Sequence, residues 1–243
     1  MFGKNPIRKL DRTPEDGKLA VQEIFYTIQG EGPFTGVPAV FIRLAGCHLA
    51  CTFCDTEFES GINDRRTVEE LATLAANMVP KTLHKIPIVV LTGGEPMRQR
   101  LAPLVGLLFD KGFEVVQIET AGNFWEPELL GFGYRLVFVC SPKTNHVHPE
   151  MAEHCANWKY VVRHNQVGVD GLPTEPTQAN STQPPWNVIA HVALTKAFDN
   201  IWISPCDDHD TTQNALNVKQ AVEVCLKHGY RLSLQTHKIV NVP

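Results

Sequence analysis

The chain has 243 residues, of which 43% are hydrophobic, enough for one large α/β domain with a substantial core. Its 22 basic and 26 acidic residues give a formal net charge of -4, which excludes a bulk attraction for nucleic acid or for an anionic membrane. The N-terminal stretch lacks the apolar run of a signal peptide, and no later run approaches the roughly 20 apolar residues of a membrane span. We therefore expect a cytosolic protein.

Strand-like runs alternate with helical stretches along the chain. The first strand is predicted in VPAVFIRLAG from Val37, the second over 86–91 and the third from Phe113, because these runs are rich in β-branched and apolar residues. Four more strands are predicted in YRLVFVCSPK, WKYVVR, NIWISP and YRLSLQT. As the alternative to a role in ligand binding, His237, just beyond the last run, is a structural histidine at a strand end.

Three amphipathic helices are predicted between these strands. The first begins at a capping box from Thr67 to Glu70, and the other two, over 98–112 and 213–229, end at glycines. This alternation predicts parallel β/α units, whose chemistry gathers at the carboxyl ends of the strands. The motifs TGGEP, ETAGN, SPK and SPCD all lie at such ends.

One segment interrupts the alternation. Residues 164–187 contain four prolines and many small polar residues, and they are predicted to form a surface insertion, with a functional lid as the alternative. The whole chain, 1–243, is otherwise predicted to be a single domain.

Three of the seven cysteines lie within eight residues, in CHLACTFC. In a reducing compartment, such a group favours metal ligation over a disulfide framework. A structural zinc site needs a fourth ligand, but His48 directly follows Cys47, and binding of one ion by both would strain the turn. Three thiolates on one loop fit a [4Fe-4S] cluster whose fourth iron is open. The four scattered cysteines are predicted to be small buried side chains: Cys140, Cys155, Cys206 and Cys225.

The spacing C-x3-C-x2-C with Phe53 in the last gap, followed by TGGEP over 92–96, resembles the radical S-adenosylmethionine superfamily. FYTIQGEG, RLAGC, CDT and the terminal QTHKIVNVP further resemble the 7-carboxy-7-deazaguanine synthase family. That resemblance implies an incomplete, strongly curved (β/α) barrel. It also implies conversion of 6-carboxy-5,6,7,8-tetrahydropterin to 7-carboxy-7-deazaguanine with loss of ammonia, in queuosine and deazapurine biosynthesis.

The resemblance also implies the site residues and cofactors. Cys47, Cys51 and Cys54 would bind a [4Fe-4S] cluster, and Thr56 would bind Mg²⁺. Residues expected around S-adenosylmethionine are Phe53, Cys54, Asp55, Gly94, Glu119, Ser141, Pro142, Lys143, Ser204, Pro205, Cys206 and Asp207. Residues expected around the pterin are Ile28, Gln29, Gly30, Arg43, Thr92, His237 and Pro243, with Gln235 as a further candidate.

The family pattern further implies a homodimer that receives electrons from a donor such as flavodoxin or ferredoxin. No acid or base catalyst is evident from the sequence, and Ala121 in ETAGN replaces an asparagine that the family often has. Two alternatives stay open. A glycyl-radical-enzyme activase shares the cysteine spacing, and a non-catalytic zinc module would bind metal without cleaving S-adenosylmethionine.

Overall fold

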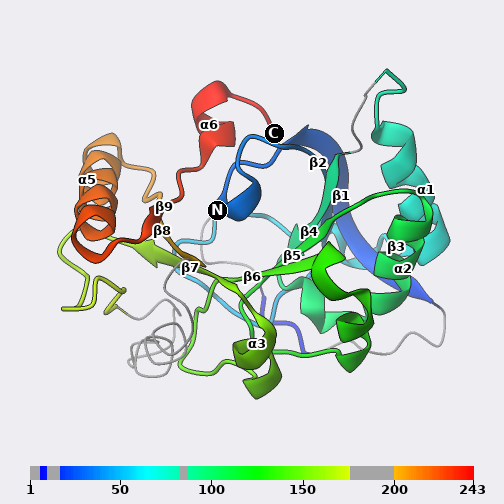
Figure 1. Ribbon diagram of the computed structural model, residues 1–243, viewed down its shortest axis with the longest axis horizontal. Helices are drawn as coiled ribbons and strands as arrows, with labels where there is room; N and C mark the ends of the chain where they lie inside the picture. The colour runs from blue at the N-terminus through cyan, green and yellow to red at the C-terminus, as the bar shows by residue number, and fades with distance from the viewer. Residues whose placement is uncertain (1–5, 10–16, 83–86, 176–199) are drawn as a thin grey trace.

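The computed structural model describes residues 6–9, 17–82, 87–175 and 200–243. Its strands form one nine-stranded sheet in the order β3-β1-β2-β4-β5-β6-β7-β8-β9. Their bounds are β1 (Lys18–Ile28), β2 (Pro38–Leu44), β3 (Arg65–Thr67), β4 (Ile88–Gly93), β5 (Val116–Thr120), β6 (Leu136–Cys140), β7 (Asn157–Val162), β8 (Ile201–Pro205) and β9 (Arg231–Leu232). The sheet is strongly curved and its edge strands, β3 and β9, do not pair with each other, so the barrel is incomplete (Figure 1).

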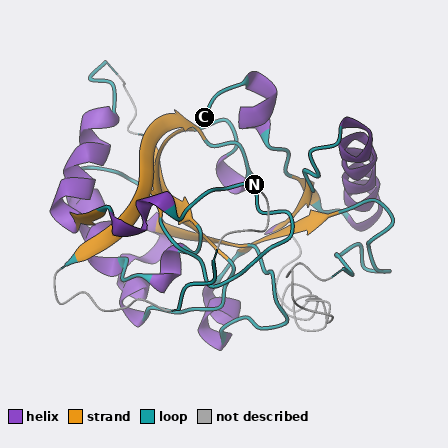
Figure 2. Cartoon of the chain, turned by 180° about the vertical axis from the view of Figure 1, so that it is seen from behind, coloured by secondary structure: helices purple, strands orange, loops and turns teal. Residues whose placement is uncertain are grey.

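The α-helices are α1 (Val68–Met78), α2 (Ala102–Asp110), α3 (Pro149–His154), α5 (Thr211–His228) and α6 (Thr236–Val240). The helices that pack on the outside of the sheet are α1, α2, α3 and α5 (Figure 2). Short 3-10 helices are η1 (Gly32–Phe34), η2 (Ser60–Asn63), η3 (Pro96–Arg98) and η4 (Pro127–Arg135). In Figure 1, α1 and α2 lie at one end of the sheet and α5 at the other. Within the described part of the chain, no helix combines the length and apolar character needed to cross a membrane.

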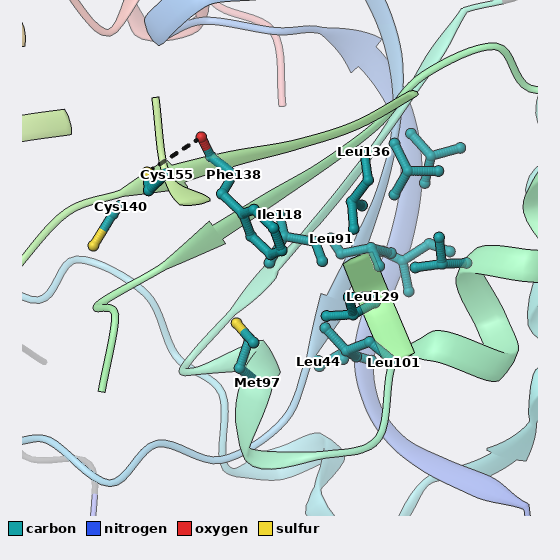
Figure 3. Close-up of a cluster of buried hydrophobic side chains, with 14 of the residues drawn as sticks. Leu44, Leu91, Met97, Leu101, Ile118, Leu129, Leu136, Phe138, Cys140 and Cys155 are labelled. Carbon is teal, nitrogen blue, oxygen red and sulfur yellow. Dashed lines mark hydrogen bonds between the residues drawn. The ribbon is translucent and has the colours of Figure 1, made fainter. Parts of the chain in front are cut away.

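Alternation along the strands separates a helix-covered face from an inner face. On β2, Ile42 and Leu44 are fully buried in the main core, whereas Phe41 and Arg43 point to the other side and line a cavity. Figure 3 shows Leu44 and Leu91 lying close to Leu101 in that core. The core therefore fills the outer layer, and the inner face is left for polar side chains.

The parallel part of the sheet confirms the predicted β/α alternation, because β2, β4, β5, β6, β7, β8 and β9 pair in parallel in chain order. The predicted capping box is also confirmed, since Thr67 Oγ1 accepts from Glu70 N and the Glu70 carboxylate accepts from Thr67 N. The predicted C-terminal glycines follow α2 and α5, and Gly229 has the left-handed φ of 74° that this position favours.

Several elements differ from the predictions. No strand is predicted before Val37 or over 65–67, yet β1 and β3 add an antiparallel edge. The last predicted strand shortens to β9, and the chain then turns into α6, so His237 lies in a helix and not at a strand end. Of the predicted insertion, 164–175 form turns with a Val167–Pro173 bridge, and 176–187 lie outside the described residues.

The helix predicted over 98–112 begins only at Ala102, for a tertiary reason. The side chain of Gln99 exchanges two hydrogen bonds with the backbone of Ala20, at 2.7 and 3.0 Å, which holds this residue outside the helix. The carboxylate of Glu126 then accepts from the backbone N–H groups of Leu101 and Ala102 at 2.8 and 3.1 Å. This distant acid replaces a local N-cap.

Candidate active site

A cavity of about 620 Å³ lies at the inner face of the sheet. Its walls come from the cysteine loop after β2, from the ends of β1, β4, β5, β6 and β8, from the inner face of β7 and from the C-terminal segment. The segments expected to carry chemistry therefore meet at one place. This is the location that parallel β/α folds use for active sites.

The cysteine loop packs directly on the turn after β4. A Cβ added to Gly94 would lie 2.3 Å from Gly46 O and 2.9 Å from Cys47 Cβ, so only glycine permits this contact. Cys47 also packs against Leu49, Phe58 and Ala121, with Cys51 and Cys54 at the border of the same small cluster. The first cysteine is thereby fixed by packing.

The spacing of the three thiols fits an iron–sulfur cluster better than a single zinc ion. Around one zinc, Zn–S bonds of about 2.3 Å would place the sulfurs about 3.8 Å apart. The sulfurs of Cys47, Cys51 and Cys54 do not all lie within 4.8 Å of one another, although they share one cavity wall. His48 is absent from that wall, and its Nε2 lies 2.9 Å from Asn123 Oδ1. Burial raises the pKa of Cys47 and of Cys54 above the usual value of a thiol.

Glu95, of the GGEP turn, lies in the cavity wall and joins β4 to β5. Its carboxylate accepts from Thr120 Oγ1 at 2.7 Å, from Ala121 N at 2.8 Å and from Met97 N at 3.1 Å. Burial raises the pKa of Glu95 above its usual value, although these hydrogen bonds oppose the shift. The Glu95 carboxylate therefore links the end of β4 to the end of β5, beside the cysteine loop.

Two lysines line the cavity, of which Lys159 is buried and Lys143 is half-buried. Lys143 donates to Ser141 O at 2.7 Å and to Ser141 Oγ, and burial lowers its pKa. Lys159 on β7 pairs with Glu31 and lies 3.8 Å from Glu119 Oε2. Burial alone would lower the pKa of Lys159, but Glu119 and Glu31 raise it, so this lysine stays charged.

This ion network continues to the end of β1. Gln29 Nε2 donates to Glu119 Oε1 at 3.0 Å, and Gln29 Oε1 accepts from Glu31 N at 3.1 Å. Burial would raise the pKa of Glu31, whereas Lys159 lowers it, so its carboxylate stays ionised. The network joins the end of β1 to β5 and β7 across the inner face.

Arg43 and Thr56 form the opposite wall. Arg43 Nη1 donates to Thr56 Oγ1 at 3.0 Å, and Thr56 Oγ1 donates to Asp55 Oδ1 at 3.2 Å. Arg43 Nε lies 2.8 Å from Glu23 Oε1, but the N–H is buried and not aligned for a hydrogen bond. Its guanidinium also lies 5.6 Å from the centre of the Phe25 ring. The Arg43 guanidinium therefore lies between the Glu23 carboxylate and the Thr56 hydroxyl on the cavity wall.

The C-terminal segment closes one side. Thr236 N and Oγ1 both donate to Gly30 O, at 3.1 and 3.0 Å, and a Cβ on Gly30 would lie 2.0 Å from His237 Nδ1. Thr27 Oγ1 donates to the Pro243 carbonyl oxygen at 2.9 Å, which places the last residue against β1. Burial lowers the pKa of His237, so its ring is neutral at pH 7.

Comparison with known proteins identifies the family. A 7-carboxy-7-deazaguanine synthase of Rhodospirillum rubrum is 41% identical over 249 aligned residues, covering 100% of both chains. The enzyme of the same name from Rickettsia prowazekii is 36% identical, covering 100% of this chain and 96% of that one. This chain belongs to the 7-carboxy-7-deazaguanine synthase family of radical S-adenosylmethionine enzymes.

A solved structure agrees with this assignment. The crystal structure of QueE from Escherichia coli superposes with a TM-score of 0.63 at 26% identity, covering 89% of this chain and 93% of that chain. No protein-family model matches the chain. The α/β fold with a mostly parallel sheet is thus common to this synthase family and the present chain.

Most residues that the family resemblance implied lie on the cavity wall. The cofactor-side residues in contact with it are Phe53, Cys54, Asp55, Gly94, Glu119, Ser141, Lys143, Ser204, Pro205 and Asp207. The substrate-side residues are Ile28, Gln29, Arg43, Thr92, Gln235, His237 and Pro243, and the metal-side residues are Cys47, Cys51, Cys54 and Thr56.

Three implied residues lie off the wall. Gly30 lies behind His237 and shapes the site through that contact. Pro142 is buried between two lining residues. Cys206 faces away, toward Arg163 and Asp208, with its sulfur 3.5 Å from Asp208 Oδ1. The buried state predicted for Cys206, Cys140 and Cys155 is confirmed, whereas Cys225 is only half-buried.

Several charged residues of this synthase site were not predicted from the sequence, among them Glu31, Lys159 and Lys238. For Lys159 there was a signal, because a lysine between Trp158 and Tyr160 in an otherwise apolar strand points to the inner face. For Glu31 and Lys238, the sequence held no signal beyond the motifs that contain them. Their partners come from distant segments.

Proposed function

We propose that the cavity converts 6-carboxy-5,6,7,8-tetrahydropterin to 7-carboxy-7-deazaguanine with loss of ammonia, as a step of queuosine biosynthesis. Family membership supports this activity. The structural observation that supports this activity is that the three-cysteine loop and the C-terminal segment face one cavity. The cofactor and substrate sides named by the family resemblance are therefore adjacent.

Family membership implies a [4Fe-4S] cluster and S-adenosylmethionine. We assign the cluster to Cys47, Cys51 and Cys54, whose spread of sulfurs and loop packing fit it. When bound, the reduced cluster and S-adenosylmethionine supply a 5'-deoxyadenosyl radical that can abstract a hydrogen atom from substrate C6. The protein's own part is to hold the two ligands in register and to exclude water.

On the cofactor side, Ser141 and Lys143 present a hydroxyl and an ammonium group at the end of β6. We assign them to S-adenosylmethionine together with Glu119, Ser204 and Asp207, since this set offers both donors and acceptors to a ribose and a carboxylate. Glu119 is also held by Gln29, so the cofactor side and the substrate side share one hydrogen-bonded network.

On the substrate side, we assign the pterin carboxylate to Arg43, whose buried Nε makes no hydrogen bond to the described residues. Thr56 is the proposed Mg²⁺ ligand. Its hydroxyl donates to Asp55 and accepts from Arg43, which leaves one lone pair of this oxygen for the ion. The carboxylate of Pro243 would pair with the amino and ring N–H groups of the pterin.

The remaining parts of the proposal are a homodimer, a cytosolic location and an electron donor such as flavodoxin or ferredoxin. The two alternative functions have less support. The thiol spacing disfavours a single zinc ion, and the relatives named above are synthases, not activases of a glycyl radical enzyme.

The test is direct. The protein is purified without oxygen, loaded with iron and sulfide, reduced, and incubated with S-adenosylmethionine, Mg²⁺ and the carboxytetrahydropterin. Liquid chromatography with mass spectrometry should detect the deazaguanine product, and Cys51→Ala should abolish it. Iron-rich reduced protein that cleaves S-adenosylmethionine without forming this product would refute the proposed substrate.

A further inference from the structure

Lys238 joins three segments that are far apart in the sequence. Its Nζ lies 2.8 Å from Asp55 Oδ2, in the cysteine loop, and 2.7 Å from Asp207 Oδ2, directly after β8. All three side chains line the cavity, and each is between 22% and 38% exposed. The lysine therefore lies at the mouth of the cavity.

In each aspartate, one carboxylate oxygen accepts from Lys238, and the other accepts hydrogen bonds from residues near it in the sequence. Asp207 Oδ1 accepts from His209 N at 3.0 Å and from Asn214 Nδ2 at 2.9 Å. Asp55 Oδ1 accepts from Thr56 Oγ1 at 3.2 Å. Because each carboxylate is oriented by its own segment, the position of the ammonium group is set from two sides.

The helix that carries Lys238 depends on such polar contacts. No residue of α6 is buried, and Ile239 is 69% exposed. Besides the packing of His237 on Gly30, polar contacts that hold this segment are those of Thr236 with Gly30, of Lys238 with the two aspartates, and of Pro243 with Thr27. With little apolar burial, loss of one charged contact should shift α6.

We propose that Lys238 is a positioning residue that couples the cofactor side of the cavity to its substrate side. The inference rests on the proposed function, in which Asp55 and Asp207 face S-adenosylmethionine and the C-terminal segment faces the pterin. Lys238 bridges the two aspartates, offsets one of their two negative charges and fixes α6 against them. Binding of S-adenosylmethionine between these segments thus orders the C-terminal segment for the pterin, and binding of the pterin favours the cofactor in return.

The experiment measures binding without turnover. In the cluster-loaded protein without a reductant, calorimetry gives the Kd of the carboxytetrahydropterin with and without saturating S-adenosylmethionine. The ratio of the two values is the coupling. It is compared in the wild type, in Lys238→Met, in Lys238→Arg and in Lys219→Met, a control on α5 whose lysine is 71% exposed.

We expect S-adenosylmethionine to tighten pterin binding by about fivefold or more in the wild type and in Lys219→Met. The ratio should fall close to one in Lys238→Met and recover in Lys238→Arg. A merely structural role would weaken each ligand by itself and leave the ratio unchanged. A wild-type ratio in Lys238→Met would overturn the inference, whereas a wild type that binds neither ligand would overturn the proposed function.

Discussion

Arg43, Thr56 and Asp55 form a short hydrogen-bonded chain on one wall of the cavity, and the middle residue is the proposed magnesium ligand. We expect Thr56→Ala to retain iron but to lose most of the stimulation of product formation by Mg²⁺, because one oxygen ligand of the ion is removed. Product formation is measured against Mg²⁺ concentration.

Thr52→Ala is the matched control, since Thr52 is exposed in the same loop and does not line the cavity. An unchanged magnesium response in Thr56→Ala would remove this residue from the metal site.

Asp208 gives a prediction for acid stability. Its carboxylate accepts from Arg163 Nε at 2.9 Å and from Asn217 Nδ2 at 2.8 Å. Burial would raise the pKa of Asp208, but the hydrogen bonds from Arg163 and Asn217 lower it below its usual value. The unfolded chain then binds a proton at higher pH than the folded protein does, so stability is lost as the pH falls below about 4.

We therefore expect Asp208→Asn to lower the free energy of unfolding by about 2 kcal/mol at pH 7 and to flatten its decline below pH 4. Urea unfolding between pH 7 and pH 3 measures both effects. Parallel pH profiles for the two proteins would contradict the predicted pKa shift.

For single residues, the direction of a side chain within a motif could be predicted from the sequence, but its interaction partners could not. The inward direction of Arg43 follows from alternation with Ile42 and Leu44, and the structure confirms it. The pairing of Lys159 with Glu31 depends on how the curved sheet brings β7 beside the end of β1, and no local pattern contains that information.

The C-terminal segment is the element on which the substrate side depends. Its end lies against Thr27, and its carboxylate is the proposed partner of the pterin. We expect a tag added after Pro243 to raise the KM for the pterin by about tenfold or more, because it removes a charged hydrogen-bond partner. Iron content should stay constant.

The same tag at the N-terminus is the control for this extension. Turnover and KM are measured with varied pterin at saturating S-adenosylmethionine. Normal kinetic constants with the C-terminal tag would refute the recognition role of the terminal carboxylate.

Elements with local signals could be predicted from the sequence, whereas those fixed by distant partners could not. The start of α1 follows from its own capping box. The start of α2 follows from Glu126, 24 and 25 residues away along the chain, and the sequence analysis placed it too early. Likewise α6 replaces the predicted end of a strand because its polar residues bond to Gly30, Asp55 and Asp207.

For the whole molecule, the main core and the cysteine loop are separate packing units. The main core extends over the strands and the helices α1, α2, α3 and α5, whereas the small cluster of Cys47, Leu49, Phe58 and Ala121 lies apart from it. We therefore expect removal of the [4Fe-4S] cluster by a chelator and an oxidant to leave the far-ultraviolet circular dichroism of the protein almost unchanged.

Removal of the cluster should nevertheless lower Tm by several degrees, because a ligand that binds only the folded state adds stability. Reconstitution should restore the original Tm. Loss of most of the helical signal on chelation would show that the sheet needs the cluster to fold.

The sequence by itself determined the β/α alternation, the motifs at the strand ends and the three-cysteine loop, because hydrophobic period, turn residues and thiol spacing are local properties. The tertiary structure decided the antiparallel edge formed by β1 and β3, the position of α6 and the charged partners within the cavity. These depend on the curvature of the sheet, which brings together side chains separated by more than 100 residues, such as Glu31 with Lys159 and Asp55 with Lys238.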